Sequence, residues 1–97
     1  MRGLRIDRHG IDEVDVDHDA MFSGDLVWGT LPFDHQHDIW FDDEGLFKPQ
    51  ICVATIGAHK RVPLPVVILG VEGESTVAAT VPFDAVESVI GDRVEIG

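Results

Sequence analysis

Apolar and polar residues alternate near the start of the chain, and this period predicts a β-hairpin. Leu4 and Ile6 share one face of a first strand, because successive side chains of a strand point to opposite faces. Residues 8–10 end in a glycine that suits a tight turn. Residues 11–17 then alternate again, so we expect them to return as a second, antiparallel strand.

The rest of the chain predicts a mostly antiparallel sheet of about five strands. Further strands are expected at residues 26–31, 33–41 and 62–70. The last of these is a continuous apolar run, which favours burial on both faces and a central place in the sheet. An edge strand is expected at residues 76–81, and the tail at residues 93–96 can pair at another sheet edge.

Two segments carry helix signals. Residues 49–57 begin with a proline and end with a glycine, as helices do, although their isoleucine and valine content favours a strand. We expect a short helix there. Within residues 82–90, the apolar side chains Phe83, Val86 and Ile90 have helical spacing. The prediction is a single α+β domain over residues 1–97, with one or two short helices on one face of the sheet.

Composition narrows the classes of partner. The chain has 97 residues, 44% of them hydrophobic, which is typical of one folded domain. The formal net charge of −11 makes nucleic acid and anionic membranes poor direct partners. Basic proteins or divalent cations fit better. An Asp-rich, Arg-rich composition is also typical of organisms whose whole proteome is acidic, in which case the charge is not specific to this protein.

The single cysteine and the amino terminus favour a cytosolic protein. One cysteine forms no intrachain disulfide, and Cys52 lies in an apolar run typical of a buried core position. The first residues contain no apolar stretch of the kind that directs secretion, and no window is long enough to span a bilayer.

The middle of the chain resembles a known family. Residues 39–47 read Ile-Trp-Phe-Asp-Asp-Glu-Gly-Leu-Phe, followed by Pro49, by Ala-Thr at residues 54–55, and by Pro-Val-Val-Ile-Leu-Gly at residues 65–70. This order resembles an uncharacterised domain-of-unknown-function family of small phage, plasmid and bacterial proteins. The chain lacks the family's usual asparagine beside the proline. The resemblance implies a mobile-element context and no activity, so it assigns no functional residues.

An acidic row along the second strand is the main candidate site. Carboxylates alternate with Val14 and Val16, so we expect the valines to face inward and the acids to share the other face, about 7 Å apart. Between residues 9 and 47 there is no lysine or arginine. We expect a binding surface for a basic partner, extended by acids and aromatic side chains of the 33–41 strand and its following turn. The residues assigned to it are Glu13, Asp15, Asp17, Asp19, Asp38, Trp40, Asp42 and Asp43.

The function expected from this row is non-enzymatic binding of a basic, nucleic-acid-binding host protein, in the manner of a phage-encoded inhibitor that mimics DNA. A simply solvated acidic face is the alternative. No catalytic motif accompanies the acids, since the serines lack nucleophile-elbow surroundings and the glycine-rich run at residues 70–75 lacks a phosphate-loop lysine. No cofactor is expected, and a homodimer is compatible with an exposed edge strand.

Histidines provide a second hypothesis. On one strand, His35 and His37 would share a face about 7 Å apart, a spacing that lets two imidazoles reach one metal ion, with His18 as third ligand. Polar surface histidines are the alternative. A third hypothesis is a pocket for a nucleotide-like ligand near Lys60 and Arg61, where positive charge is concentrated.

Overall fold

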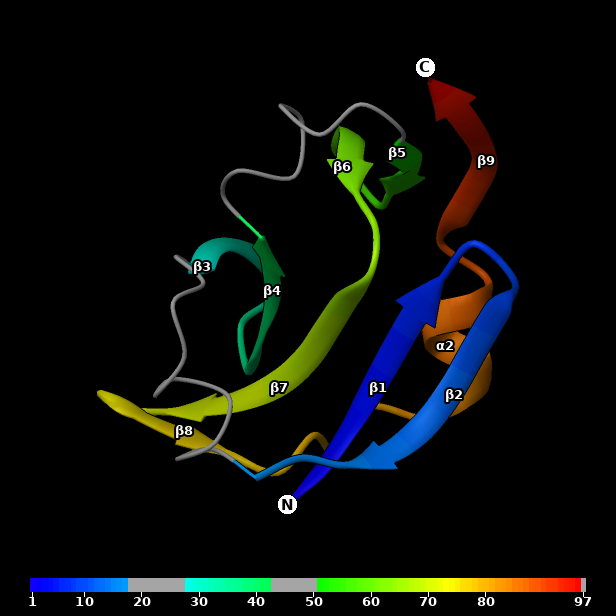
Figure 1. Ribbon diagram of the computed structural model, residues 1–97. Coiled ribbons are helices and arrows are strands. Elements are labelled where there is room, and N and C mark those ends of the chain that lie inside the picture. The colour runs from blue at the N-terminus through cyan, green and yellow to red at the C-terminus, as the bar shows by residue number, and fades with distance from the viewer. Residues whose placement is uncertain (18–27, 43–50, 97) are drawn as a thin grey trace.

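The computed structural model describes residues 1–17, 28–42 and 51–96, and its strands form two antiparallel sheets (Figure 1). The six-stranded sheet contains β1 (Arg2–Asp7), β2 (Gly10–Asp15), β3 (Trp28–Asp34), β4 (His37–Asp42), β7 (Val66–Glu72) and β8 (Ser75–Val77). The three-stranded sheet contains β5 (Ile51–Ile56), β6 (His59–Pro63) and β9 (Ile90–Ile96). One helix, α2 (Phe83–Glu87), lies in the described part of the chain.

Strand β7 organises the larger sheet. The strand order is β2-β1-β7-β4-β3, and β8 pairs with the carboxyl-terminal end of β7. Ile68 of β7 lies opposite both Leu4 of β1 and Ile39 of β4, and all three side chains are fully buried. The central position predicted from the apolar run is therefore confirmed for β7, which Figure 1 shows as a long curved strand between the two halves of its sheet.

The hydrophobic core lies between the inner face of the larger sheet and the smaller sheet with α2. The larger sheet, the smaller sheet and α2 all contribute side chains to a single cluster of buried residues. That cluster contains Leu4, Ile6, Ile39, Ile56, Val62, Val66, Ile68, Val81 and Val86. The two sheets thus share one core, and α2 closes it beside the β1–β2 hairpin.

The prediction of an α+β fold with one sheet of about five strands is wrong, because the described residues form two sheets and a single short helix, so the fold is nearly all β. The helix expected within residues 49–57 is instead strand β5, in which β-branched side chains pack against β6 and β9. The second helix is only Phe83–Glu87, since the chain turns at residues 88–89 and Ile90 begins β9. The predicted pairing of the carboxyl-terminal tail at a sheet edge is confirmed, because β9 pairs with β5.

Two predicted strands are each divided by a turn. The run at residues 62–70 is split at Leu64 and Pro65, and its halves belong to different sheets as β6 and β7. Proline lacks the N–H that a continuous strand would need there. The strand expected at residues 33–41 contains a turn at residues 35–36, where the Asp34 carboxylate accepts the Gln36 backbone N–H at 2.7 Å.

The predicted β1–β2 hairpin is confirmed, and one carboxylate holds its turn together. Asp7 accepts the backbone N–H groups of His9 at 2.8 Å and Gly10 at 3.0 Å, and it pairs with Arg5. The His9 N–H has the largest effect on the pKa of Asp7. Together with Gly10 and Arg5 it lowers this pKa from its ordinary value, against the opposing effect of burial.

This lowered pKa predicts a loss of stability in acid. The folded-state pKa of Asp7 lies below its unfolded value, so its contribution is present above the unfolded pKa of about 3.9 and is lost as the pH falls through the folded pKa. Urea denaturation at neutral pH and below about pH 4 measures the effect. Asp7→Asn, which keeps an acceptor oxygen without the charge, is expected to lose less stability over this range. An identical acid slope in the two proteins would contradict this assignment.

Candidate functional site

The acids of β2 lie along one edge of the larger sheet. Among the described residues β2 pairs only with β1, so its other side faces away from the sheet. Glu13, Asp15 and Asp17 are exposed and alternate with half-buried Val14 and Val16. Asp19 lies outside the described residues. The edge therefore carries a row of carboxylates with the alternation that the sequence predicts.

Strand register decides which way these acids point. Glu13 lies opposite Leu4, so it projects from the inner face of the sheet, on the side of α2. The prediction that Val14 faces inward is therefore wrong, because Val14 lies opposite Gly3 on the other face. Asp12, exposed and opposite Arg5, projects from the outer face. Edge strand β2 thus presents negative charge on both of its faces.

Two of these acids have cationic neighbours within the protein. The amino-terminal ammonium lies 2.9 Å from an Asp15 oxygen, and its hydrogen bond lowers the pKa of that carboxyl. The Arg2 Nε lies 3.2 Å from a Glu13 oxygen. Arg2 is itself anchored through hydrogen bonds to the carbonyl oxygens of Ala79 and Val81. Both Asp15 and Glu13 stay exposed, and exposed ion pairs of this kind contribute little to stability, so their carboxylates still face solvent.

The structure does not bring Asp38 and Trp40 together with Glu13. Within β4, Ile39 points into the core on the same face as Glu13, so its neighbours Asp38 and Trp40 point to the outer face. Strands β1 and β7 also separate β4 from β2. Asp42 ends β4, and Asp43 lies outside the described residues. The acids assigned to one surface therefore fall into two groups.

The histidines have different environments. His35 lies exposed in the turn between β3 and β4, whereas His37 begins β4 and is 3% exposed. The Nδ1 atom of His37 lies 2.9 Å from an Asp34 oxygen, and its Nε2 accepts the backbone N–H groups of Thr80 at 3.0 Å and Val81 at 3.2 Å. This pattern corresponds to a neutral ring that donates from Nδ1.

These contacts bear directly on the metal hypothesis. Both ring nitrogens of His37 are occupied by protein partners, and His35 does not share its strand face. His18 lies outside the described residues. Within residues 1–17, 28–42 and 51–96, no group of three or more histidine, cysteine or acidic side chains is placed to hold a metal ion. The geometry instead assigns His37 a structural role.

The basic pair of the ligand hypothesis lies on the smaller sheet. Lys60 and Arg61 are exposed in β6, where two residues oppose Thr55 of β5 and Arg61 has a positive φ of 59°. A hollow of about 150 Å³ adjoins Arg61 and is also lined by Asp92. A carboxylate in such a small hollow opposes the binding of a phosphate group there.

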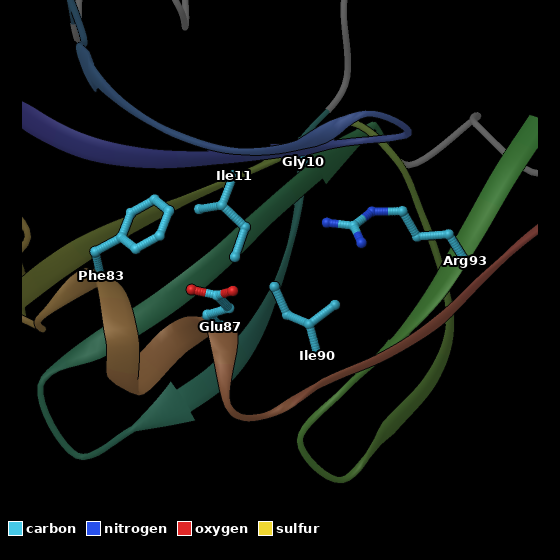
Figure 2. A pocket seen from close by; sticks show the side chains of 6 residues that line it. All are labelled: Gly10, Ile11, Phe83, Glu87, Ile90 and Arg93. Carbon is cyan, nitrogen blue, oxygen red and sulfur yellow. The ribbon is translucent and has the colours of Figure 1, made fainter.

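A larger cavity lies beside the acidic edge, between the hairpin, α2 and β9 (Figure 2). Its volume is about 280 Å³. Apolar side chains form its walls and two opposite charges face into it. The lining residues are Gly10, Ile11, Phe83, Glu87, Ile90 and Arg93. Ile11 projects from the same face of β2 as Glu13, so this cavity is continuous with the inner side of the acidic edge.

Sequence reasoning missed this cavity. Helical spacing put Phe83 on one apolar face with Val86, but only Val86 is fully buried and Phe83 is 37% exposed. The helix ends at Glu87, so its short apolar face covers less of the core than the spacing implied. The exposed ring of Phe83 becomes a wall of the cavity beside Glu87 (Figure 2).

Comparisons with protein-family models, with curated proteins and with solved structures found no match for this chain. The resemblance to a family of small phage and plasmid proteins therefore stays a prediction. No helix within the described residues is long and apolar enough to cross a membrane.

Proposed function

We propose that this protein is a non-enzymatic binding protein that takes up a basic, extended segment of a partner protein along β2. One observation carries the proposal: among the strands of the described residues, β2 is a sheet edge that presents exposed carboxylates on both faces, beside a partly apolar cavity. The partner class is that of the basic segments found in nucleic-acid-binding proteins. The proposal places this binding in the cytosol.

The chemistry of a sheet edge supports an extended partner. An edge strand has backbone N–H and C=O groups that a further strand can pair with, and alternate side chains of the added strand then give specificity. Lysine or arginine side chains directly opposite Glu13 and Asp15, which share one face of β2, would lie about 5 Å away, where opposite charges attract. A second copy of this acidic chain would be repelled at the same edge, so the charges discriminate between partners.

The neighbouring cavity supplies an apolar anchor. Inward-facing side chains of an added strand would lie over Ile11 and Phe83, next to the Glu87 carboxylate. Burial of even part of one aliphatic side chain there contributes about 1–2 kcal/mol, which charge attraction at an exposed surface does not supply alone. Ile11 shares the inner face with Glu13 and Asp15, so the best partner segment carries a basic residue at every second position, and the aliphatic stem of the one opposite Ile11 is the apolar anchor.

A defined peptide tests the proposal. A fluorescently labelled peptide of alternating lysine and valine is titrated with the protein, at low and at physiological salt, and anisotropy reports binding. The double variant Glu13→Lys/Asp15→Lys is expected to bind at least about tenfold more weakly and with a smaller salt dependence. The matched control is Glu72→Lys/Glu74→Lys, which makes the same change of charge on exposed residues at the β7–β8 turn.

The control variant separates an effect at β2 from an effect of net charge. If both double variants lose the same affinity, the peptide responds only to net charge and the assignment to β2 is wrong. If the unmodified protein does not bind the peptide, the proposed function itself is contradicted, and the acids of β2 then serve to keep this edge from associating.

A further inference from the structure

Arg93 lies at the hairpin end of the cavity, and its guanidinium is held in place. Its Nε donates a hydrogen bond to the Asp7 carbonyl oxygen at 2.8 Å. Figure 2 shows the remaining guanidinium nitrogens directed into the cavity below Gly10. Arg2, Arg5 and Arg8 each pair with a carboxylate. None of the ion pairs described within residues 1–17, 28–42 and 51–96 involves Arg93, so its outer edge is presented to whatever enters the cavity.

The direction of β2 determines which end of an added strand reaches Arg93. Every strand pairing in both sheets is antiparallel. Strand β2 runs from Gly10 to Asp15, so a segment that extends the sheet in the same antiparallel manner runs from Asp15 toward Gly10. Its carboxyl end then lies beside Gly10, at the same end of the cavity as Arg93.

We propose that this cavity binds the free carboxyl terminus of the partner segment, with Arg93 as the residue that recognises the carboxylate. The inference rests on the proposed function and names the part of the partner that is bound. A guanidinium whose Nε is already used still offers terminal N–H groups, which match the two oxygens of a carboxylate. Arg93 therefore selects a chain end rather than an internal segment.

Glu87 further restricts which ligand can bind in the cavity. Its carboxylate faces the same cavity but forms no described ion pair with Arg93. A free inorganic anion would gain from Arg93 and be repelled by Glu87. A carboxyl-terminal lysine or arginine satisfies both groups, because its terminal carboxylate pairs with Arg93 and its side chain with Glu87. Its aliphatic stem contacts Ile11 and Ile90.

Two forms of one peptide test the inference. The alternating lysine–valine peptide, ending in lysine, is made with a free carboxylate and with a carboxyl-terminal amide. Amidation removes a negative charge, so attraction to a protein of net charge −11 would by itself make the amide bind more tightly. We expect the reverse, with the free acid binding at least about tenfold more tightly to the unmodified protein.

The variant Arg93→Gln locates the effect. It should abolish the preference for the free acid and leave the affinity for the amide unchanged, because the amide makes no ion pair with Arg93. The comparison of the two peptides on the unmodified protein needs no variant, so it stands even if Arg93→Gln fails to fold. Equal or tighter binding of the amide to the unmodified protein overturns the inference and leaves the proposed function intact. Absence of binding by both peptides overturns both.

Discussion

Replacing His37 with alanine is expected to lower the free energy of unfolding by about 2–4 kcal/mol, measured by urea denaturation. The ring joins two distant segments, since it donates to Asp34 in the β3–β4 turn and accepts the N–H groups of Thr80 and Val81 ahead of α2. Removing it leaves the shielded N–H of Val81 without an acceptor. It also removes a buried ring that packs edge-on against Phe33, with ring centroids 6.4 Å apart.

Two further variants separate the causes of this loss. His37→Phe keeps a ring of similar size but has no acceptor, so it is expected to remain destabilised, although less than the alanine variant. His35→Ala is the matched control, because His35 is exposed in the adjacent turn and its removal should change stability by less than about 0.5 kcal/mol. A His37→Phe protein as stable as the unmodified one would show that the hydrogen bonds contribute nothing net.

Gly70→Ala is the second variant for which a large effect is expected, a loss of about 1–3 kcal/mol. Gly70 is buried at the point where β7 pairs with both β4 and β8, opposite His37 and Val77. An added Cβ would lie 2.5 Å from the Ala78 carbonyl oxygen and 3.0 Å from a Val77 methyl group. The closer contact is with backbone, so relief requires the chain that follows β8 to move away from β7.

Gly10→Ala provides the control for glycine replacement as such. A Cβ at Gly10 would meet nothing within 4 Å, and both variants gain the same restriction of the unfolded chain, worth about 0.4–1 kcal/mol. The difference in unfolding free energy between the two variants therefore reports the contact with Ala78. If the Gly70 variant unfolds at the same urea concentration as the Gly10 variant, β8 and its following chain yield to the methyl group at no cost.

Local signals succeeded where a feature depends on neighbouring residues. The β1–β2 hairpin follows from alternation on both sides of a tight turn at residues 8–9, and both signals act over a few residues. The turn at residues 35–36 also has a local sequence signal, which is an aspartate at position 34 whose side chain can accept a nearby N–H. The period-two spacing of His35 and His37 instead favours one continuous strand. The metal hypothesis depends on that strand, because only there would the two histidines share a face.

Longer apolar runs gave less reliable predictions. The run at residues 62–70 was expected to be one central strand, and β7 is central, but β6 belongs to the other sheet. Burial on both faces produces the same apolar pattern in either sheet, so the pattern does not show where the chain passes from one to the other. The local pattern of residues 51–56 is compatible with either a helix or a strand. These residues form a strand because they pair with both β6 and β9.

The sequence by itself determined that β2 alternates carboxylates with valines, because side-chain direction in a strand has a period of two residues. It also determined the net charge and thus the sign of a favourable partner. Only the tertiary structure decided that β2 is an edge among the described strands, that Glu13 and Asp38 point to opposite faces, and that Ile11, Phe83 and Arg93 meet at one cavity. These features depend on pairing and packing between segments far apart in the chain. A local sequence pattern does not reveal the free energy of such long-range contacts.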